Sequence, residues 1–222
     1  MNRNAPVLLV LIGSFNPPTL GHLRLLELAK DYLKQQSLNV IGGVMSPVHN
    51  DYKKHKKSLI DYSHRRAMVE LATQNTWIKC STWEGKQNTW TPTRPTLEAL
   101  QELAREEYNE PNLVAKLVCG ADLLESFNVP GLWKWEDIDK ILGNHGVIVA
   151  RRAGSNPDQF VFKHDLCYKH RNNIRIVYEP VNNDVSSTVL RTLASRNCSI
   201  RFLTTDPVCD YITERKLYCS DQ

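Results

Sequence analysis

The 222-residue chain has no apolar run long enough to cross a bilayer, and its longest such run covers only residues 7–12. Its first six residues contain neither the apolar core of a signal peptide nor the Arg- and Ser-rich pattern of a presequence. These absences predict a protein that acts inside the cell and away from membranes. Cytoplasm or nucleus is the favoured compartment, and the mitochondrion stays open.

The spacing of the cysteines argues against two further classes of protein. The six cysteines include no Cys-x-x-Cys pair and no cluster, whereas zinc sites and disulfide frameworks need such groupings. We expect Cys119, which lies within an apolar run, to be a small buried hydrophobic residue.

Two common phosphate-binding motifs are also missing. The chain has no Gly-x-x-x-x-Gly-Lys-[Ser/Thr] and no Gly-x-Gly-x-x-Gly. It lacks an aromatic-basic repeat and any signature of a nucleic-acid-binding fold. Its net charge is nevertheless +4, and basic residues concentrate at 53–57 and 151–152. Positive charge can serve a nucleic acid, but a pocket for small phosphate-bearing ligands needs it as well, and the missing signatures argue against the first option.

Short apolar runs alternate with helical patterns along the chain, which is typical of a parallel sheet flanked by helices. We predict strands at 7–12, 39–45, 78–82, 115–119, 146–150 and 174–178. Helices are predicted at 20–36, 61–74, 96–107, 136–142, 187–195 and 207–216. Asp61 or Ser63 is expected to cap the second helix, and Ser186 or Ser187 the fifth. The fold class is a single doubly wound, Rossmann-like α/β domain over residues 1–222, with a helical C-terminal part.

The most informative stretch is Gly-Ser-Phe-Asn-Pro-Pro-Thr-Leu-Gly-His at 13–22, between the first predicted strand and the first predicted helix. Such a turn presents backbone N–H groups and the positive end of a helix dipole to one place, which favours an anion such as phosphate. Gly13 allows close approach of the backbone because it has no Cβ. His22 lies in the first helical turn, where its ring can stabilise charge that develops at the same place.

This stretch resembles the first signature of the nucleotidyltransferase superfamily, Gly-x-Phe-x-Pro…[His/Thr]-x-Gly-His. The second signature, Ser-[Ser/Thr]-x-x-Arg, is present within 185–191. Further stretches resemble eukaryotic nicotinamide/nicotinic acid mononucleotide adenylyltransferases in particular. They include Ser-Pro-Val at 46–48, Trp-Thr-Pro-Thr at 90–93 and Leu-Val-Cys-Gly-Ala-Asp-Leu-Leu-Glu-Ser-Phe at 117–127. The resemblance extends from about residue 7 to about residue 218, nearly the whole chain.

The resemblance implies an enzyme of NAD biosynthesis. It would join ATP to nicotinamide mononucleotide, or to nicotinic acid mononucleotide, and release pyrophosphate with NAD or deamido-NAD. The attacking phosphate is already an anion, so the reaction needs in-line positioning and neutralisation of charge rather than a general base. The catalytic residues implied are His22 and Arg191. Contacts to ATP are implied for Gly13, Ser14, Phe15, His22, Thr188 and Arg191.

A second group of residues is implied to hold the mononucleotide. The group consists of Lys54, Trp90, Thr93, Gly120, Asp122, Leu132, Trp133, Arg152 and Asn183. Trp90 and Trp133 would offer indole faces to a cationic pyridine ring, and Thr93 would bond its carboxamide. The choice among Lys53, Lys54 and Lys56 stays open, because the loop at 49–58 is longer than usual for the family.

Mg²⁺ is the cofactor implied, carried mainly by ATP, because no cluster of Asp and Glu offers a dedicated protein site. The expected binding partners are ATP, the two mononucleotides and NAD, with no nucleic acid and no membrane. A homo-oligomer is compatible with the sequence.

Two other hypotheses remain. A related transferase could act on phosphopantetheine or a phosphoalcohol, but such substrates have no ring for Trp90, Thr93 and Trp133 to hold. A non-catalytic nucleotide-binding or chaperone-like protein could share the scaffold, but intact His22 and Arg191 argue against it.

Overall fold

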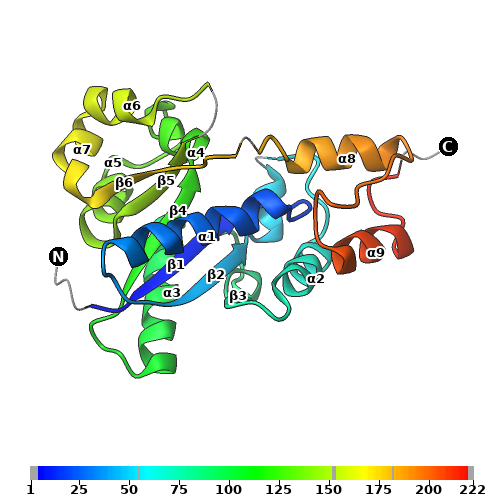
Figure 1. Cartoon of the computed structure of the whole chain (residues 1–222), viewed down its shortest axis with the longest axis horizontal. Helices are drawn as coiled ribbons and strands as arrows, with labels where there is room; N and C mark the ends of the chain where they lie inside the picture. The colour runs from blue at the N-terminus through cyan, green and yellow to red at the C-terminus, as the bar shows by residue number, and fades with distance from the viewer. Residues whose placement is uncertain (1–4, 55, 152–153, 182, 220–222) are drawn as a thin grey trace. The chain divides into compact units, whose positions relative to one another are not determined.

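The computed structural model describes residues 5–54, 56–151, 154–181 and 183–219 (Figure 1). Its strands are β1 (Val7–Gly13), β2 (Val40–Pro47), β3 (Ile78–Cys80), β4 (Val114–Gly120), β5 (Val147–Arg151) and β6 (Ile174–Tyr178). Its α-helices are α1 (Leu20–Gln35), α2 (Tyr62–Thr73), α3 (Thr93–Tyr108), α4 (Ala121–Glu125), α5 (Trp135–Lys140), α6 (Pro157–Lys163), α7 (Asp165–Lys169), α8 (Ser187–Ser195) and α9 (Asp206–Glu214).

The six strands form one sheet with the order β3-β2-β1-β4-β5-β6. The pairings of β1 with β4, β4 with β5 and β5 with β6 are parallel, with Val7 opposite Val114 and Leu117 opposite Val147. The strand order reverses between β1 and β4, which is the switch point at which ligands bind in doubly wound folds. The predicted fold class is therefore confirmed: a Rossmann-like parallel sheet with helices.

Contacts divide the chain into two compact units, and the divisions fall within β1, α1 and β2. The sheet unit comprises residues 1–12, 25–44 and 92–182, and the loop unit comprises 13–24, 45–91 and 183–222. The expectation of one nucleotidyltransferase domain over the whole chain is not tested by this division and stays a prediction.

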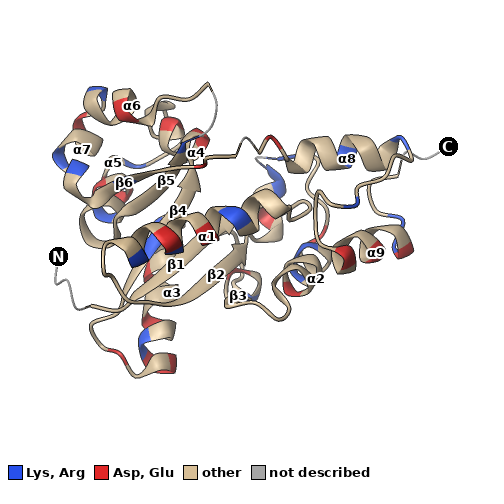
Figure 2. Ribbon diagram, in the orientation of Figure 1, with Lys and Arg blue, Asp and Glu red and all other residues tan. Residues whose placement is uncertain are grey.

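The core of the sheet unit is made by strands that are apolar on both faces, as expected for a parallel sheet covered by helices. Leu9, Val10, Leu117 and Ile148 are buried there, and so is Cys119, as predicted. Charged residues of both signs follow one another along α1, whereas β1 carries none (Figure 2).

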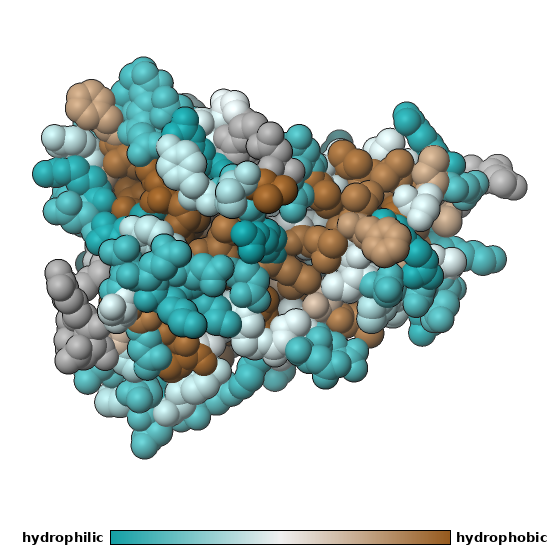
Figure 3. All heavy atoms as spheres, viewed as in Figure 1, coloured by the Kyte–Doolittle hydropathy of each residue, from teal (hydrophilic) through white to brown (hydrophobic). Residues whose placement is uncertain are grey.

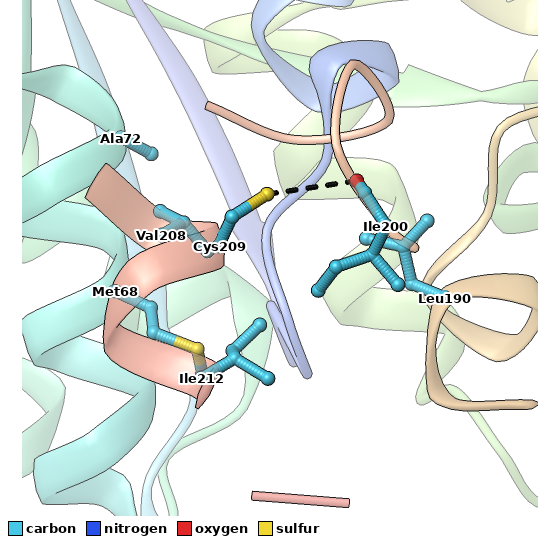
Figure 4. Packing of buried hydrophobic residues seen from close by; sticks show 7 residues of the cluster. All are labelled: Met68, Ala72, Leu190, Ile200, Val208, Cys209 and Ile212. Atoms are coloured by element: carbon cyan, nitrogen blue, oxygen red, sulfur yellow. Dashed lines mark hydrogen bonds between the residues drawn. The ribbon is translucent and has the colours of Figure 1, made fainter. Parts of the chain in front are cut away.

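The core of the loop unit is a hydrophobic cluster between α2, α8, α9 and the segment before α9. Figure 4 shows its members, which are Met68, Ala72, Leu190, Ile200, Val208, Cys209 and Ile212. Because Met68 and Ala72 are one helical turn apart, they lie on the same face of α2. This cluster anchors α2 and α8, the helices that carry the charged residues described below.

On the surface in view, most residues are hydrophilic, and hydrophobic residues gather over α8 (Figure 3). Val189 of that helix is about half-exposed. No helix among the described residues is both long enough and apolar enough to cross a membrane.

The sequence did not predict α4, α6 and α7, because helices of this length offer too few residues for a periodic pattern. For α6 a local signal was present: Asn156 accepts a hydrogen bond from the Gln159 amide (3.1 Å), and Pro157 occupies the first turn. Helix α3 begins at Thr93 rather than at residue 96, since Pro95 in its first turn needs no intrahelical hydrogen bond.

One predicted cap is correct and one is not. Ser186 caps α8 by accepting a hydrogen bond from the Val189 amide (3.3 Å). Asp61 occupies the N-cap position of α2 but makes no capping hydrogen bond, because its carboxylate pairs with Lys53 (2.7 Å). The first amide of α2, on Tyr62, instead donates to the Asn50 side chain (2.6 Å).

Candidate nucleotide-binding site

The loop that follows β1 is fixed by packing around its glycine. A Cβ added to Gly13 would lie 3.2 Å from the ring of Phe15, a tight contact that glycine avoids. Phe15 is buried and has a positive φ of 43°, a backbone conformation that a bulky residue adopts only where its surroundings impose it. The Val48 amide donates to the Gly13 carbonyl (3.0 Å) and joins this loop to the end of β2.

The ring of His22 is oriented by Thr19. The Thr19 amide donates to His22 Nδ1 (3.0 Å), and the Thr19 hydroxyl lies 2.8 Å from the same nitrogen. Because Nδ1 accepts a backbone hydrogen bond, the proton of a neutral ring lies on Nε2. Phe15 packs edge-on against the ring, with centroids 5.2 Å apart. Thr19, which takes the place of a superfamily histidine, thus orients the histidine that remains.

The second signature meets the first within the loop unit. Arg191 donates from Nη1 to the Asn16 carbonyl (2.8 Å) and from Nη2 to the Thr188 hydroxyl (3.3 Å). Ser187 donates to the Pro17 carbonyl (2.7 Å). Arg191 and Thr188, which are three residues apart, therefore share one face of α8.

The lysine that lies beside the loop is Lys56. Its ammonium is 3.4 Å from the Ser14 hydroxyl, and its pKa is lowered, first by burial and then by the positive charges of Arg191 and Arg65. Lys54, the residue chosen from the sequence, is exposed. The sequence could not separate the two, because a run of lysines carries no periodic signal.

Among the described residues of the loop unit, two buried charged residues were missed from the sequence. Arg65 on α2 and Glu84, in the 3₁₀ turn Glu84–Lys86, are both buried. Arg65 donates to the Ser14 carbonyl (3.1 Å). Its signal was present, since an arginine takes the place of a hydrophobic residue on the buried face of a predicted helix.

Besides Lys54, two of the residues assigned to the mononucleotide belong to the loop unit. Trp90 is half-buried, and its ring lies 5.7 Å from that of Tyr52 at an angle of 47°. Asn183 accepts a hydrogen bond from the Val185 amide (3.1 Å). A Cβ on Gly21 would lie 3.2 Å from the Val185 carbonyl, so this glycine lets the 183–185 segment pass close to the start of α1.

The remaining residues of that group belong to the sheet unit. Gly120 ends β4, and Asp122 is exposed in the first turn of α4. Trp133 donates its indole N–H to Ser126 (3.0 Å) and packs edge-on against Phe127 at 4.9 Å. The other members are Leu132, which is exposed, and Thr93, which begins α3 and is half-buried. Arg152 lies outside the described residues.

The charges of the loop unit suit an anionic ligand. Lys56, Arg65 and Arg191 supply positive charge around Ser14 and Asn16, near the N-terminus of α1. Within the described part of the chain, no three His, Cys, Asp or Glu side chains are grouped so that they could hold a metal ion.

The fold and the paired signatures define a nucleotidyltransferase, and residues 10–193 match the family described as cytidylyltransferase-like. The chain is 42% identical to nicotinamide/nicotinic acid mononucleotide adenylyltransferase 1 of Bos taurus, over 99% of this chain and 91% of that protein. It is 41% identical to the nicotinamide-nucleotide adenylyltransferase of Drosophila melanogaster, over 93% of this chain and 59% of that longer protein.

A solved structure gives the same fold. The nicotinic acid mononucleotide adenylyltransferase of Plasmodium falciparum, in complex with NaAD, superposes with a TM-score of 0.67 over 96% of this chain and 97% of its own, at 21% identity. At that identity the likeness supports the fold alone. Together with the two relatives, the match to the family model shows that this chain belongs to the nicotinamide/nicotinic acid mononucleotide adenylyltransferases of the cytidylyltransferase-like family.

Proposed function

We propose that this protein transfers the adenylyl group of ATP to nicotinamide mononucleotide, or to nicotinic acid mononucleotide, for NAD biosynthesis. A phosphate oxygen of the mononucleotide attacks the α-phosphorus of ATP in line. The bond from that phosphorus to the β-phosphate bridging oxygen breaks, and pyrophosphate leaves with the electron pair. The products are NAD, or deamido-NAD, and pyrophosphate.

The proposal rests on the hydrogen bonds that join the second signature, in α8, to the first signature, in the 13–22 loop. Arg191 bonds the carbonyl of Asn16, 175 residues away, and Ser187 bonds the carbonyl of Pro17, 170 residues away. Both signatures thereby place basic or N–H groups around one short loop. Such preorganised donors neutralise charge as it develops on bridging and leaving oxygens.

Within this proposal the loop unit holds ATP. The main chain of Gly13, Ser14 and Phe15, with Thr188, binds the phosphates. His22 donates from Nε2–H, and Arg191 neutralises the departing pyrophosphate. Magnesium, brought by ATP, would shield the phosphate charges.

The other residues hold the mononucleotide. Lys54 or Lys56, with Arg152, would bind its phosphate. Trp90 and Trp133 would stack on the pyridine ring, Thr93 would bond its substituent, and Gly120, Asp122, Leu132 and Asn183 would contact the rest of the molecule.

Further features of the proposal are a homo-oligomeric state, a cytoplasmic or nuclear place of action, and no role for nucleic acid or membrane. One nucleotidyltransferase domain over residues 1–222 is proposed with them.

A panel of acceptors tests the proposed reaction. Purified protein with ATP and Mg²⁺ should release pyrophosphate with either pyridine mononucleotide and give no product with phosphopantetheine or a phosphoalcohol. Turnover of one of these two acceptors at a comparable rate would assign the protein to the related transferases. No turnover with any acceptor, from folded protein, would favour a non-catalytic role.

A further inference from the structure

Arg65 occupies a position that a hydrophobic residue would normally fill. Arg65, Met68, Val69 and Ala72 are all buried and follow the spacing of one helical face of α2. Met68 and Ala72 pack beside α9 in the hydrophobic cluster of the loop unit (Figure 4). The cluster therefore holds the backbone of Arg65 in place. Burying the guanidinium in this core costs desolvation free energy.

The Arg65 guanidinium bridges two separate segments. Nε donates to the Ile60 carbonyl (3.0 Å), just before α2, and Nη1 donates to the Ser14 carbonyl (3.1 Å), 51 residues away. The hydroxyl of Ser14 in turn lies against the Lys56 ammonium. Arg65 therefore holds the carbonyl of Ser14, while the hydroxyl of the same serine contacts the Lys56 ammonium.

The surroundings of Arg65 leave its charge only partly balanced. Its Nη2 atom is buried without a hydrogen-bond partner among the described residues, as is Glu84 Oε2. Burial lowers the pKa of Arg65 to about 10, so the guanidinium stays charged at neutral pH. Burial raises the pKa of Glu84 to about 8, against the hydrogen bond from the Ser46 hydroxyl (2.7 Å) and the charge of Arg65.

We propose that Arg65 is a positioning residue for adenylyl transfer. Through Ser14 it fixes the 13–15 loop and the Lys56 ammonium, and it adds a buried positive charge behind the phosphates that the loop binds. The inference rests on the proposed function, because it assigns Arg65 a role in that reaction without contact to the substrate. Its effect should appear in turnover more than in ground-state binding, since misplaced donors matter most where charge develops.

The central test compares Arg65→Lys with Arg66→Lys. Lysine keeps the charge but lacks the planar fork that reaches two carbonyls. Arg66 lies next to it on α2 and pairs with Glu70 (3.2 Å), where both side chains are about half-exposed. We expect Arg65→Lys to lower kcat by about 10–100-fold and to change KM for either substrate by less than about threefold, while Arg66→Lys leaves both unchanged.

A double-mutant cycle separates positioning from a general loss of structure. Lys56→Gln should lower kcat/KM by about tenfold in the wild-type background and by less than about threefold in Arg65→Lys, because both residues act through Ser14. Losses that multiply would overturn the proposal. Arg65→Gln, which removes the charge, is made alongside; if neither Arg65 variant folds, Arg65 belongs to the core alone and the proposal falls.

Amide hydrogen exchange measures how firmly the loop is held, and the measurement does not depend on catalysis. Amides of residues 13–24 should exchange faster in Arg65→Lys than in wild type or Arg66→Lys, and unchanged exchange would count against the positioning role. The exchange experiment therefore tests the positioning role of Arg65 separately from the proposed adenylyl transfer. If the wild-type protein makes no NAD, the proposed function fails, while the exchange data still show whether Arg65 fixes the loop.

Discussion

The 13–22 loop and the 120–133 segment are both assigned to nucleotide binding, but they are built differently. Asn16 and Thr19 in the loop are buried, and hydrogen bonds from α2, α8 and the segment between α8 and α9 fix its carbonyl groups. In the other segment Leu132 is 52% exposed and Asp122 is exposed as well, while Trp133 contacts Ser126 and Phe127 of the same segment.

The difference follows from what each region is proposed to do. Charge that develops on phosphates is stabilised only by donors already in position, so the loop needs rigid support from several segments. A flat ring can be recognised by an aromatic face, which tolerates small shifts and changes of substituent. Changes in the loop should therefore reduce turnover, and changes in the 120–133 segment should weaken mononucleotide binding.

The largest effect is expected from the catalytic pair. His22→Ala or Arg191→Ala should lower kcat by about 10²–10³-fold, because each removes a donor that acts on developing charge. Steady-state kinetics with both substrates measure this, and KM for the mononucleotide should change much less. Near-normal turnover in His22→Ala would refute the assigned role.

The next effect separates two lysines. Lys56→Gln should lower kcat/KM by about tenfold, the typical loss for one well-placed charge contact, whereas Lys54→Gln should change it by less than about threefold. The two substitutions remove the same charge, so each is the control for the other. The reverse order would show that Lys54, the residue chosen from the sequence, is the phosphate ligand.

A smaller effect is expected at the ring-binding tryptophans. Trp90→Ala and Trp133→Ala should each raise KM for the mononucleotide by about fivefold and leave ATP binding nearly unchanged, because an aromatic contact contributes about 1 kcal/mol. Trp135→Ala is the matched control, since Trp135 is exposed and stacks on His164. If all three substitutions raised KM equally, Trp90 and Trp133 would have no specific role in binding the ring.

Discrimination between the two mononucleotides should be smaller still. The indole faces contact the pyridine ring and not its substituent. The Thr93 hydroxyl can both donate and accept a hydrogen bond. We expect kcat/KM values for the amide and the acid to agree within roughly tenfold, about 1.4 kcal/mol. Kinetics with both acceptors decide this, and a thousandfold preference would mean that a buried group reads the substituent.

The smallest effect concerns stability around Arg65. Because the folded protein raises the pKa of Glu84 from 4.5 to about 8, it holds that proton more tightly than the unfolded chain. This contribution is complete at acid pH and is lost as pH rises from about 4.5 to about 8. Glu84→Gln should therefore raise Tm relative to wild type at alkaline pH and not at acid pH. Thermal unfolding across pH measures the difference, and a constant offset would contradict the shifted pKa.

The sequence predicted the sheet well, because strands buried on both faces are continuous apolar runs, as in 7–12 and 146–150. The loop motif could also be recognised from the sequence, because the strand, the glycine turn and the helix follow one another along the chain. The bond from Arg65 to Ser14 could not be predicted, because it joins segments 51 residues apart and leaves no local periodicity. Lys56 could not be chosen over Lys54 because burial separates them and their residue type does not.

The most direct test of the central claim is the stoichiometry of products from ATP and nicotinamide mononucleotide with Mg²⁺. Direct transfer at the 13–22 loop predicts equimolar NAD and pyrophosphate, and no pyrophosphate when the mononucleotide is omitted. Pyrophosphate release without the mononucleotide, or release without NAD, would contradict adenylyl transfer to this acceptor.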